Sequence, residues 1–242
     1  MRAFGKSDVG RVRNSNQDAF LCANLSENAV LAILCDGMGG ASGGNVASSV
    51  TVDVVSTQIM ATYRDDMSAS SIKNMLESAV AAANIELFDR ATVDEDLRGM
   101  GTTIVIALVV SGVLHLVHVG DSRAYLVDSE GLTQVTRDHT VVQTMVENGQ
   151  ITEEEARSHP RKHFITRAIG VDIEVKCEYN LLDMREKESL ILCSDGLSNL
   201  LDEDDIFEMI TQTENAEDVP SLLIHKANMA GGSDNITVIY MI

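Results

Sequence analysis

The stretch TTIVIALVVSGVLHLVHVGDSRAYLV (residues 102–127) decides the fold of this 242-residue chain. Its β-branched and aliphatic residues form short runs that are separated by Ser-Gly and by Gly-Asp-Ser. This pattern predicts strands joined by tight turns. Together with the run LTQV at residues 132–135, the stretch predicts an antiparallel meander at the heart of a sheet.

Two strands and two helices are predicted before this stretch. Residues 19–25 and 29–35 are apolar runs on either side of the turn-like sequence SEN, which favours an antiparallel hairpin. Residues 45–63 and 70–90 carry apolar side chains at helical spacing. We expect these two helices to cover one face of the sheet.

The chain after this stretch adds a polar segment and a second set of elements. Residues 138–150 and 152–158 have polar helical patterns, and we expect a flap at about 138–170 that lies over the site rather than in the core. The remaining elements are expected at residues 174–182 and 189–193 (strands), 202–211 and 216–230 (helices) and 235–242 (strand).

This order of elements is not the alternation of a parallel α/β protein, since strands and helices come in separate groups. It predicts an α+β fold, a four-layer α-β-β-α sandwich of two antiparallel sheets flanked by helices. The two prolines, Pro160 and Pro220, do not mark a linker, so one domain spanning residues 1–242 is expected.

The composition excludes some classes of function. There are 37 acidic against 18 basic residues, and the net charge of −19 argues against a nucleic-acid or anionic-membrane surface, because both need a basic footprint. No signal peptide is recognisable and no apolar run approaches the about 20 residues of a membrane span. The four cysteines have no metal-type spacing and are expected to be reduced thiols, as in a cytoplasmic protein.

Acidic residues adjoin apolar runs at four places along the chain. They are Asp18, Asp36, Asp195 and Asp234. A carboxylate at a strand end can meet its counterparts at the edge of a sheet, where Mg²⁺ or Mn²⁺ is held by oxygen ligands. Asp36 is the best candidate to bridge two ions, because the carbonyl of Gly37 beside it can approach a cation unhindered.

The chain resembles the metal-dependent, type-two-C protein serine/threonine phosphatases in their compact bacterial form. Seven blocks carry the resemblance in family order: GRVRNSNQDAF (10–20), DGMGG (36–40), GMGTT (99–103), HVGDSRAY (118–125), DHT (138–140), CSDGL (193–197) and GGSDN (231–235). Nearly the whole chain is covered.

The resemblance implies a role for each matched residue. Asp36 and Gly37 would bridge two Mn²⁺ or Mg²⁺ ions, and Asp195 and Asp234 would complete the second ion's ligands. Asp18 would orient metal-bound waters. A third, weaker ion would be held by Asp121 together with Asp195.

The implied reaction is direct attack of a metal-bridging water or hydroxide on phosphorus, with no phosphoenzyme. Arg13 is assigned to the substrate phosphate, because a planar guanidinium can grip two phosphoryl oxygens. The expected substrates are phosphoserine and phosphothreonine proteins, with a bacterial serine/threonine kinase as the opposing partner and a monomeric enzyme.

Three positions depart from the family pattern. Members often carry a histidine where this chain has Met38 or Ala41, so a metal-bound water or His139 is the hypothesis for the acid that protonates the leaving group. Gln17 stands where many relatives have Glu, and we expect Gln17→Glu to tighten apparent metal affinity.

Alternatives remain open at this level. The departures favour a non-catalytic or regulatory phosphoprotein-binding module of the same fold, whereas the intact aspartates favour an enzyme. A small-molecule phosphomonoesterase is a third reading, because the carboxylates recognise only metal and phosphate. His115 and His118 alternate along a strand and are expected to form local hydrogen bonds rather than bind metal.

Overall fold

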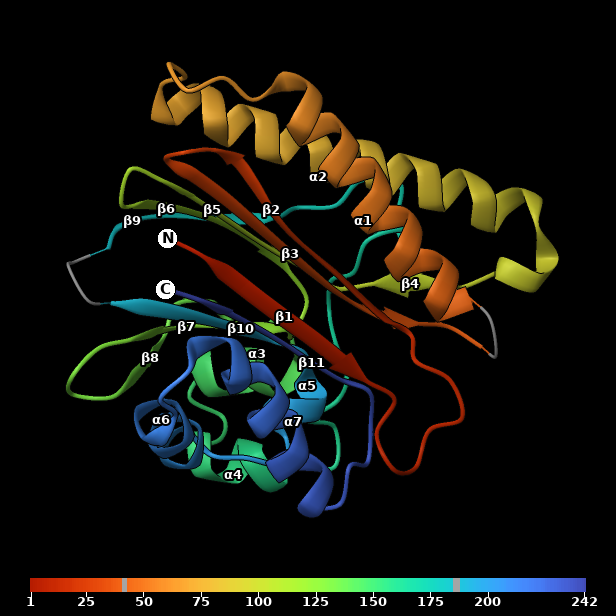
Figure 1. Ribbon diagram of the computed structural model, residues 1–242. Coiled ribbons are helices and arrows are strands. Elements are labelled where there is room, and N and C mark those ends of the chain that lie inside the picture. Colours follow the sequence, from red (N-terminus) through yellow and green to blue (C-terminus); the bar gives the residue numbers. More distant parts are fainter. Residues whose placement is uncertain (41–42, 185–187) are drawn as a thin grey trace.

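The computed structural model describes residues 1–40, 43–184 and 188–242, so Ala41 lies outside the described residues. These residues form two antiparallel sheets stacked face to face, with helices on both outer sides (Figure 1). The predicted four-layer α-β-β-α sandwich is confirmed.

The two sheets draw their strands from distant parts of the chain. The five-stranded sheet has, in spatial order, β1 (Ala3–Asp8), β11 (Ile236–Met241), β10 (Ser189–Cys193), β7 (Arg123–Val127) and β8 (Leu132–Gln134). The six-stranded sheet has β2 (Asp18–Ser26), β3 (Ala29–Met38), β5 (Ile104–Val110), β6 (Val113–Val119) and β9 (Glu178–Asp183), with β4 (Gly101–Thr102) paired to β3.

Strand β3 is buried on both faces, which explains its continuous apolar run. Leu31 and Ile33 point toward the helices, whereas the alternate residues Ala32 and Leu34 pack between the two sheets. The predicted hairpin is confirmed, because β2 and β3 pair antiparallel along their length.

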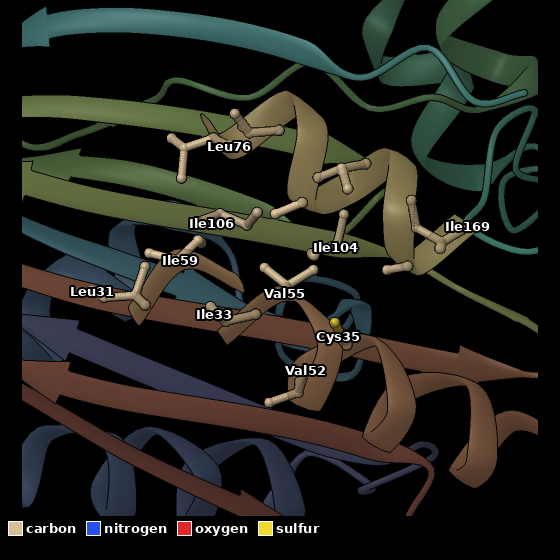
Figure 2. Packing of buried hydrophobic residues seen from close by; sticks show 14 of the residues in the cluster. Leu31, Ile33, Cys35, Val52, Val55, Ile59, Leu76, Ile104, Ile106 and Ile169 are labelled. Carbon is tan, nitrogen blue, oxygen red and sulfur yellow. The ribbon is translucent and has the colours of Figure 1, made fainter. Parts of the chain in front are cut away.

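Helices α1 (Gly43–Thr62) and α2 (Ala69–Val93) cover the outer face of the six-stranded sheet, as predicted. Val55 and Ile59 of α1 pack toward Leu31 and Ile33, and Leu76 of α2 belongs to the same cluster (Figure 2). A short 3-10 helix, η1 (Glu95–Leu97), follows α2. This packed layer gives the strand ends a rigid base.

The five-stranded sheet is covered by α5 (Asp195–Ser198), α6 (Glu203–Gln212), η2 (Ala216–Asp218) and α7 (Val219–Met229). Asp202 caps α6 by accepting a hydrogen bond from the Asp205 N–H. Across the described ranges, no helix has both the length and the apolar character that crossing a bilayer requires.

The predicted meander at residues 102–135 is wrong in one respect. Strands β5 and β6 lie in the six-stranded sheet, whereas β7 and β8 lie in the five-stranded sheet. The chain crosses between the sheets at Gly120, whose φ of +108° favours glycine and where a Cβ would come within 2.5 Å of Thr103 Cγ2. Asp121 therefore sits at the crossing.

The flap contains α3 (Val141–Glu147) and α4 (Glu153–Ser158). Of the described residues in these two helices, Val142 alone is buried, which agrees with their polar sequence. An isolated bridge between Thr140 and Ile165 joins the two ends of the segment, and a bridge from Thr102 to Ile169 connects it to β4. The expectation that the whole segment lies outside the core is wrong at its end, because Ile169 is buried in the cluster under α1 and α2.

Candidate metal centre

The predicted acidic residues come from separate elements and meet at one end of the sheets. Asp18 and Asp36 are directly paired in the register of β2 and β3. Asp195 opens α5 immediately after β10, and Asp234 precedes β11. The carboxyl of Asp36 is repelled by those of Asp18, Asp195, Asp121 and Asp234, in that order, so all five share one electrostatic site.

Burial and mutual repulsion disfavour the ionised form of four of these acids, Asp18, Asp36, Asp121 and Asp195. Burial, followed by repulsion from Asp18, raises the pKa of Asp36 well above its usual value. Burial, followed by the charge of Asp195, raises the pKa of Asp121 to about 7. A cation would reverse this effect, since it favours the charged form of each carboxylate.

Asp18 provides a more specific test of whether a cation fits. Its Oδ2 accepts hydrogen bonds from Ser194 Oγ at 2.9 Å and Thr237 Oγ1 at 2.6 Å. Its Oδ1 is buried and has no hydrogen-bond partner among the described residues. Burial raises the pKa of Asp18 to about 7, although the two hydroxyl groups oppose this. An orphaned carboxylate oxygen beside four other acids suits a hydrated divalent ion.

The glycines that follow two of these aspartates allow close backbone packing. A Cβ on Gly37 would lie 2.0 Å from the carbonyl oxygen of Gly44, and a Cβ on Gly196 would lie 2.0 Å from that of Asn235. No side chain could be accommodated at either position without moving the backbone. The Asp-Gly pairs thus hold the acid-bearing segments together rather than simply making turns.

Arg13 lies at the exposed edge of the acid cluster. Its Nη2 donates to Asp234 Oδ2 at 2.7 Å, and its side chain is 54% exposed. The hydrogen bond to Asp234, with the charges of Asp234, Asp195 and Asp36, raises the pKa of Arg13. The guanidinium keeps other N–H groups that can bind a phosphate.

Two threonines that the sequence analysis did not single out position Asp36. The Asp36 N–H donates to Thr103 Oγ1 at 3.0 Å, and Thr102 Oγ1 donates to the Asp36 carbonyl at 2.8 Å. Thr103 Oγ1 also shares a 2.7 Å hydrogen bond with Ser122 Oγ, the residue after Asp121. This chain links the predicted bridging ligand to the crossing between the sheets. In the sequence, these residues could have been found because they lie in the GMGTT and GDSR blocks that match the family.

Asn235 fixes the loop that carries Arg13. Its Oδ1 accepts from the Gln17 N–H at 2.8 Å, and its Nδ2 donates to the carbonyls of Val9 at 3.0 Å and Ser15 at 2.9 Å. The side chain of Gln17 points elsewhere, because its Nε2 donates to the Gly40 carbonyl at 3.1 Å. Gln17 thus has a structural role that a glutamate cannot reproduce.

A separate group of three side chains has metal-like spacing. The ligand atoms of His118, His139 and Glu178 all lie within 4.8 Å of one another, and no other such His/Cys/Asp/Glu group occurs in the described part of the chain. The aspartates of the acid cluster are more widely spread, as expected if they surround more than one ion.

Protein partners already contact both ring nitrogens of His139 and the Glu178 carboxylate of this triad. Gly120 N–H donates to His139 Nδ1 at 3.1 Å, so the proton of the neutral ring is on Nε2, which faces Glu178 Oε1 at 3.1 Å. A metal on Nε2 would leave this imidazole with no proton at all. Arg167 Nη1 also lies 3.2 Å from the same carboxylate.

The expected local hydrogen bonds of His115 and His118 are confirmed. His115 Nδ1 contacts Tyr179 Oη at 2.8 Å, and His118 Nε2 contacts the backbone of Arg137. The hypothesis that His139 is the acid is not supported, because both of its ring nitrogens are engaged. Burial lowers the pKa of His139 to about 4. It is a positioning residue that holds Gly120 beside Asp121.

This fold and this site define a class of protein. Two stacked antiparallel sheets that gather buried carboxylates beside an exposed guanidinium suit an enzyme that cleaves phosphate esters with divalent cations. Residues 10–230 match the family model described as protein phosphatase 2C. The chain belongs to this family and is a protein serine/threonine phosphatase.

Individual relatives agree with the family match. A serine/threonine phosphatase from Listeria monocytogenes is 35% identical, and the alignment covers 99% of this chain and 94% of that protein. The structure of Stp1 from Staphylococcus aureus superposes with a TM-score of 0.94 at 33% identity and covers 100% of this chain and 94% of that one.

A third relative bears on the metal. The catalytic domain of the phosphatase PstP in complex with 2 manganese ions has a TM-score of 0.85 and 35% identity, covering 99% of this chain and 96% of that chain. The family is metal-dependent. The alternative of a non-catalytic binding module is not supported by these likenesses.

Proposed function

We propose that this enzyme hydrolyses phosphoserine and phosphothreonine in proteins with two Mn²⁺ or Mg²⁺ ions that activate a bridging water. The observation that carries the proposal is the cluster of five carboxylates beside the half-exposed Arg13, which bonds to Asp234. Burial and mutual repulsion raise the pKa values of four of them, namely Asp18, Asp36, Asp121 and Asp195. Such a cluster needs cations to be ionised at neutral pH.

Each acid has a proposed role. Asp36 and the Gly37 carbonyl would hold both ions, and Asp195 and Asp234 would complete the ligands of the second ion. Asp18 orients water through its unpartnered Oδ1. When bound, the ions lower the pKa of the attacking water and neutralise the phosphoryl oxygens.

A third, weaker ion site is proposed at Asp121 and Asp195. The support is electrostatic, because after burial itself the charge of Asp195 is the largest cause that raises the pKa of Asp121. The Thr103–Ser122 and Gly120–His139 hydrogen bonds hold the Asp121 turn in place.

Arg13 binds the phosphoryl group of the substrate in this proposal. Its exposed guanidinium contacts Asp234 with one nitrogen, so the others can orient two phosphoryl oxygens at the open side of the site. The leaving group takes its proton from water, since Met38 has none to give and the ring of His139 is engaged.

The decisive experiment follows phosphate release from a phosphothreonine peptide against Mn²⁺ concentration, with metal-stripped enzyme as baseline and Asp36→Asn as the matched variant. Saturable release that the variant lacks supports both the reaction and the bridging role. Absence of release at every Mn²⁺ and Mg²⁺ concentration would contradict the proposal.

The wider setting is also proposed. A serine/threonine kinase is the expected opposing partner, because it makes the phosphoesters that this enzyme cleaves. We propose a monomer whose single catalytic domain covers residues 1–242, with the flap at about 138–170. The four cysteines are free thiols, which supports a cytoplasmic location.

A further inference from the structure

The flap concentrates positive charge in an acidic protein. Residues 157–167, with the sequence RSHPRKHFITR, contain four of the 18 basic residues of a chain whose net charge is −19. They are Arg157, Arg161, Lys162 and Arg167. Such a concentration against the overall charge suggests a local partner of negative charge.

Three of these four charges have no ion pair in the part of the chain that the structure describes. Arg167 pairs with Glu178, but no ion pair to Arg157, Arg161 or Lys162 occurs among the described residues. The Arg161 guanidinium has only Met145 Sδ, at 4.0 Å, as a side-chain partner in the described ranges. Two of the flap's carboxylates are engaged elsewhere, since Glu147 pairs with Arg137 and Glu155 caps α4, and the exposed Glu153 and Glu154 form no ion pair among the described residues. Arg161 is thus free to bind a carboxylate.

Arg161 lines a pocket in the flap. The pocket has a volume of about 290 Å³ and is lined by Val141, Thr144, Met145, Gln150, Arg161 and Thr166. We call it the flap pocket. Its apolar floor can take the methylene groups of a side chain, whereas Arg161 and the neutral hydroxyl and amide groups can bind a charged end.

The flap pocket is connected to the metal centre by two hydrogen bonds. Thr166 N–H, in the pocket wall, donates to the His139 carbonyl at 2.7 Å. His139 N–H in turn donates to the carbonyl of Gly120 at 2.9 Å, directly before Asp121. These two bonds bring the pocket wall close to Asp121, so a few residues of an extended substrate chain are long enough to join the acid cluster to the pocket.

We propose that the flap pocket binds a carboxylate side chain of the phosphoprotein substrate, close in sequence to the phosphorylated residue, through Arg161. The inference rests on the proposed function and gives it a substrate class, namely phosphorylation sites with acidic flanks. An exposed arginine in a pocket discriminates by attraction for acidic and repulsion of basic side chains.

The test uses phosphothreonine peptides that differ at one flanking position, which carries Glu, Gln or Lys and is moved stepwise along both sides. We expect kcat/KM for the best Glu peptide to exceed that for its Lys counterpart by about three- to tenfold at low salt. The preference should shrink as salt is added.

Variants assign the preference to one residue. Arg161→Gln should remove the preference, and Arg161→Glu should reverse it in favour of Lys. Arg157→Glu is the matched control, because Arg157 is an exposed arginine of α4 that does not line the pocket. It should retain the preference of the unaltered enzyme.

Hydrolysis of p-nitrophenyl phosphate separates this inference from the proposed function. That small substrate does not reach the pocket, so all three variants should cleave it at the unaltered rate. If the unaltered enzyme does not cleave p-nitrophenyl phosphate in the presence of Mn²⁺, the proposed function itself is contradicted. Normal cleavage with equal rates for Glu, Gln and Lys peptides, or equal effects of Arg157→Glu and Arg161→Glu, would overturn the flap-pocket assignment alone.

Discussion

The acid cluster and the flap lie beside each other and are stabilised in opposite ways. At the acid cluster, buried and half-buried carboxylates are held by strand ends, close backbone contacts and buried hydroxyl groups such as those of Ser122 and Ser194. In the described flap helices, Val142 alone is buried and the charged side chains face solvent. The reaction thus depends on a rigid part of the fold, whereas substrate preference can change at the surface without disturbing it.

The largest effect is expected from removing one charge of the acid cluster, which should abolish activity without lowering stability. Asp36→Asn should lower kcat by about a thousandfold or more, because the proposed bridging ligand is lost. The metal-free variant should unfold at the same or a higher temperature, since burial and four like charges disfavour the Asp36 carboxylate. Enzyme assays and thermal melting check the two effects.

The control for this prediction is Asp66→Asn, an exposed residue in the turn between α1 and α2, which should change neither property. A metal-free Asp36→Asn protein that is clearly less stable than the unaltered protein would contradict the interpretation. Asp36 would then be needed for folding itself.

The free energy of unfolding should also depend on pH, because the same carboxylates repel one another when they ionise. Asp18 and Asp121 have folded pKa values of about 7 against an ordinary value of 3.8, so the folded protein binds more protons than the unfolded chain between these values. The free energy of unfolding of the metal-free protein should therefore fall by a few kcal/mol as pH rises from about 4 to about 7. Urea denaturation at a series of pH values measures it.

Added Mn²⁺ should reduce this fall, because the ions favour the ionised carboxylates. Stability that is constant or increases over this pH range in metal-free protein would count against the raised pKa values.

The hydroxyl network should matter for metal binding more than for folding. Thr103→Val keeps the shape of the side chain but removes the acceptor for Asp36 N–H and the partner of Ser122. We expect activity or apparent Mn²⁺ affinity to fall by about 10- to 100-fold, as for other residues that orient ligands. Thr103→Ser should restore most of it.

A metal titration followed by activity provides the measurement for the threonine variants. Thr57→Val, on the exposed face of α1, is the control. Equal titrations for Thr103→Val and Thr57→Val would show that the network does not position Asp36.

Gln17→Glu should have opposing effects of smaller size. The new charge should tighten apparent Mn²⁺ affinity, as expected from the sequence. The loss of the hydrogen bond from Gln17 Nε2 to the Gly40 carbonyl should lower the free energy of unfolding of the metal-free protein by about 1–2 kcal/mol. Calorimetric metal titration measures the change in Mn²⁺ affinity, and urea denaturation measures the change in the free energy of unfolding. An unchanged affinity would argue against the effect of the new charge, and an unchanged free energy of unfolding would argue against the role of the hydrogen bond.

The smallest effect is expected in the flap. Arg161→Gln should change the free energy of unfolding by less than about 0.5 kcal/mol, because the side chain is exposed and has no ion pair among the described residues. Urea denaturation of this variant and of Arg157→Gln should give overlapping curves. A large loss of stability would mean that the flap is part of the cooperative core.

The sequence predicted the elements well and their partners less well. Periodicity located β2, β3 and the two long helices within a few residues, because it reports which face of each element is buried. The same periodicity does not show which sheet a strand joins, so the crossing at Gly120 was missed. His139 was considered as an acid because Met38 and Ala41 stand where relatives carry histidine. Its contacts with Gly120 and Glu178 could not be read from the sequence, because these residues come from other elements.

By itself, the sequence determined the α+β layers, the family and the set of aspartates, because local patterns and ordered motifs are properties of the chain. Only the tertiary structure decided that these acids face one another, that Asp18 keeps an unpartnered oxygen, that Gln17 bonds to Gly40, and that Arg161 lines a pocket. These features depend on distances between residues far apart in the chain, which packing sets and motif spacing does not encode.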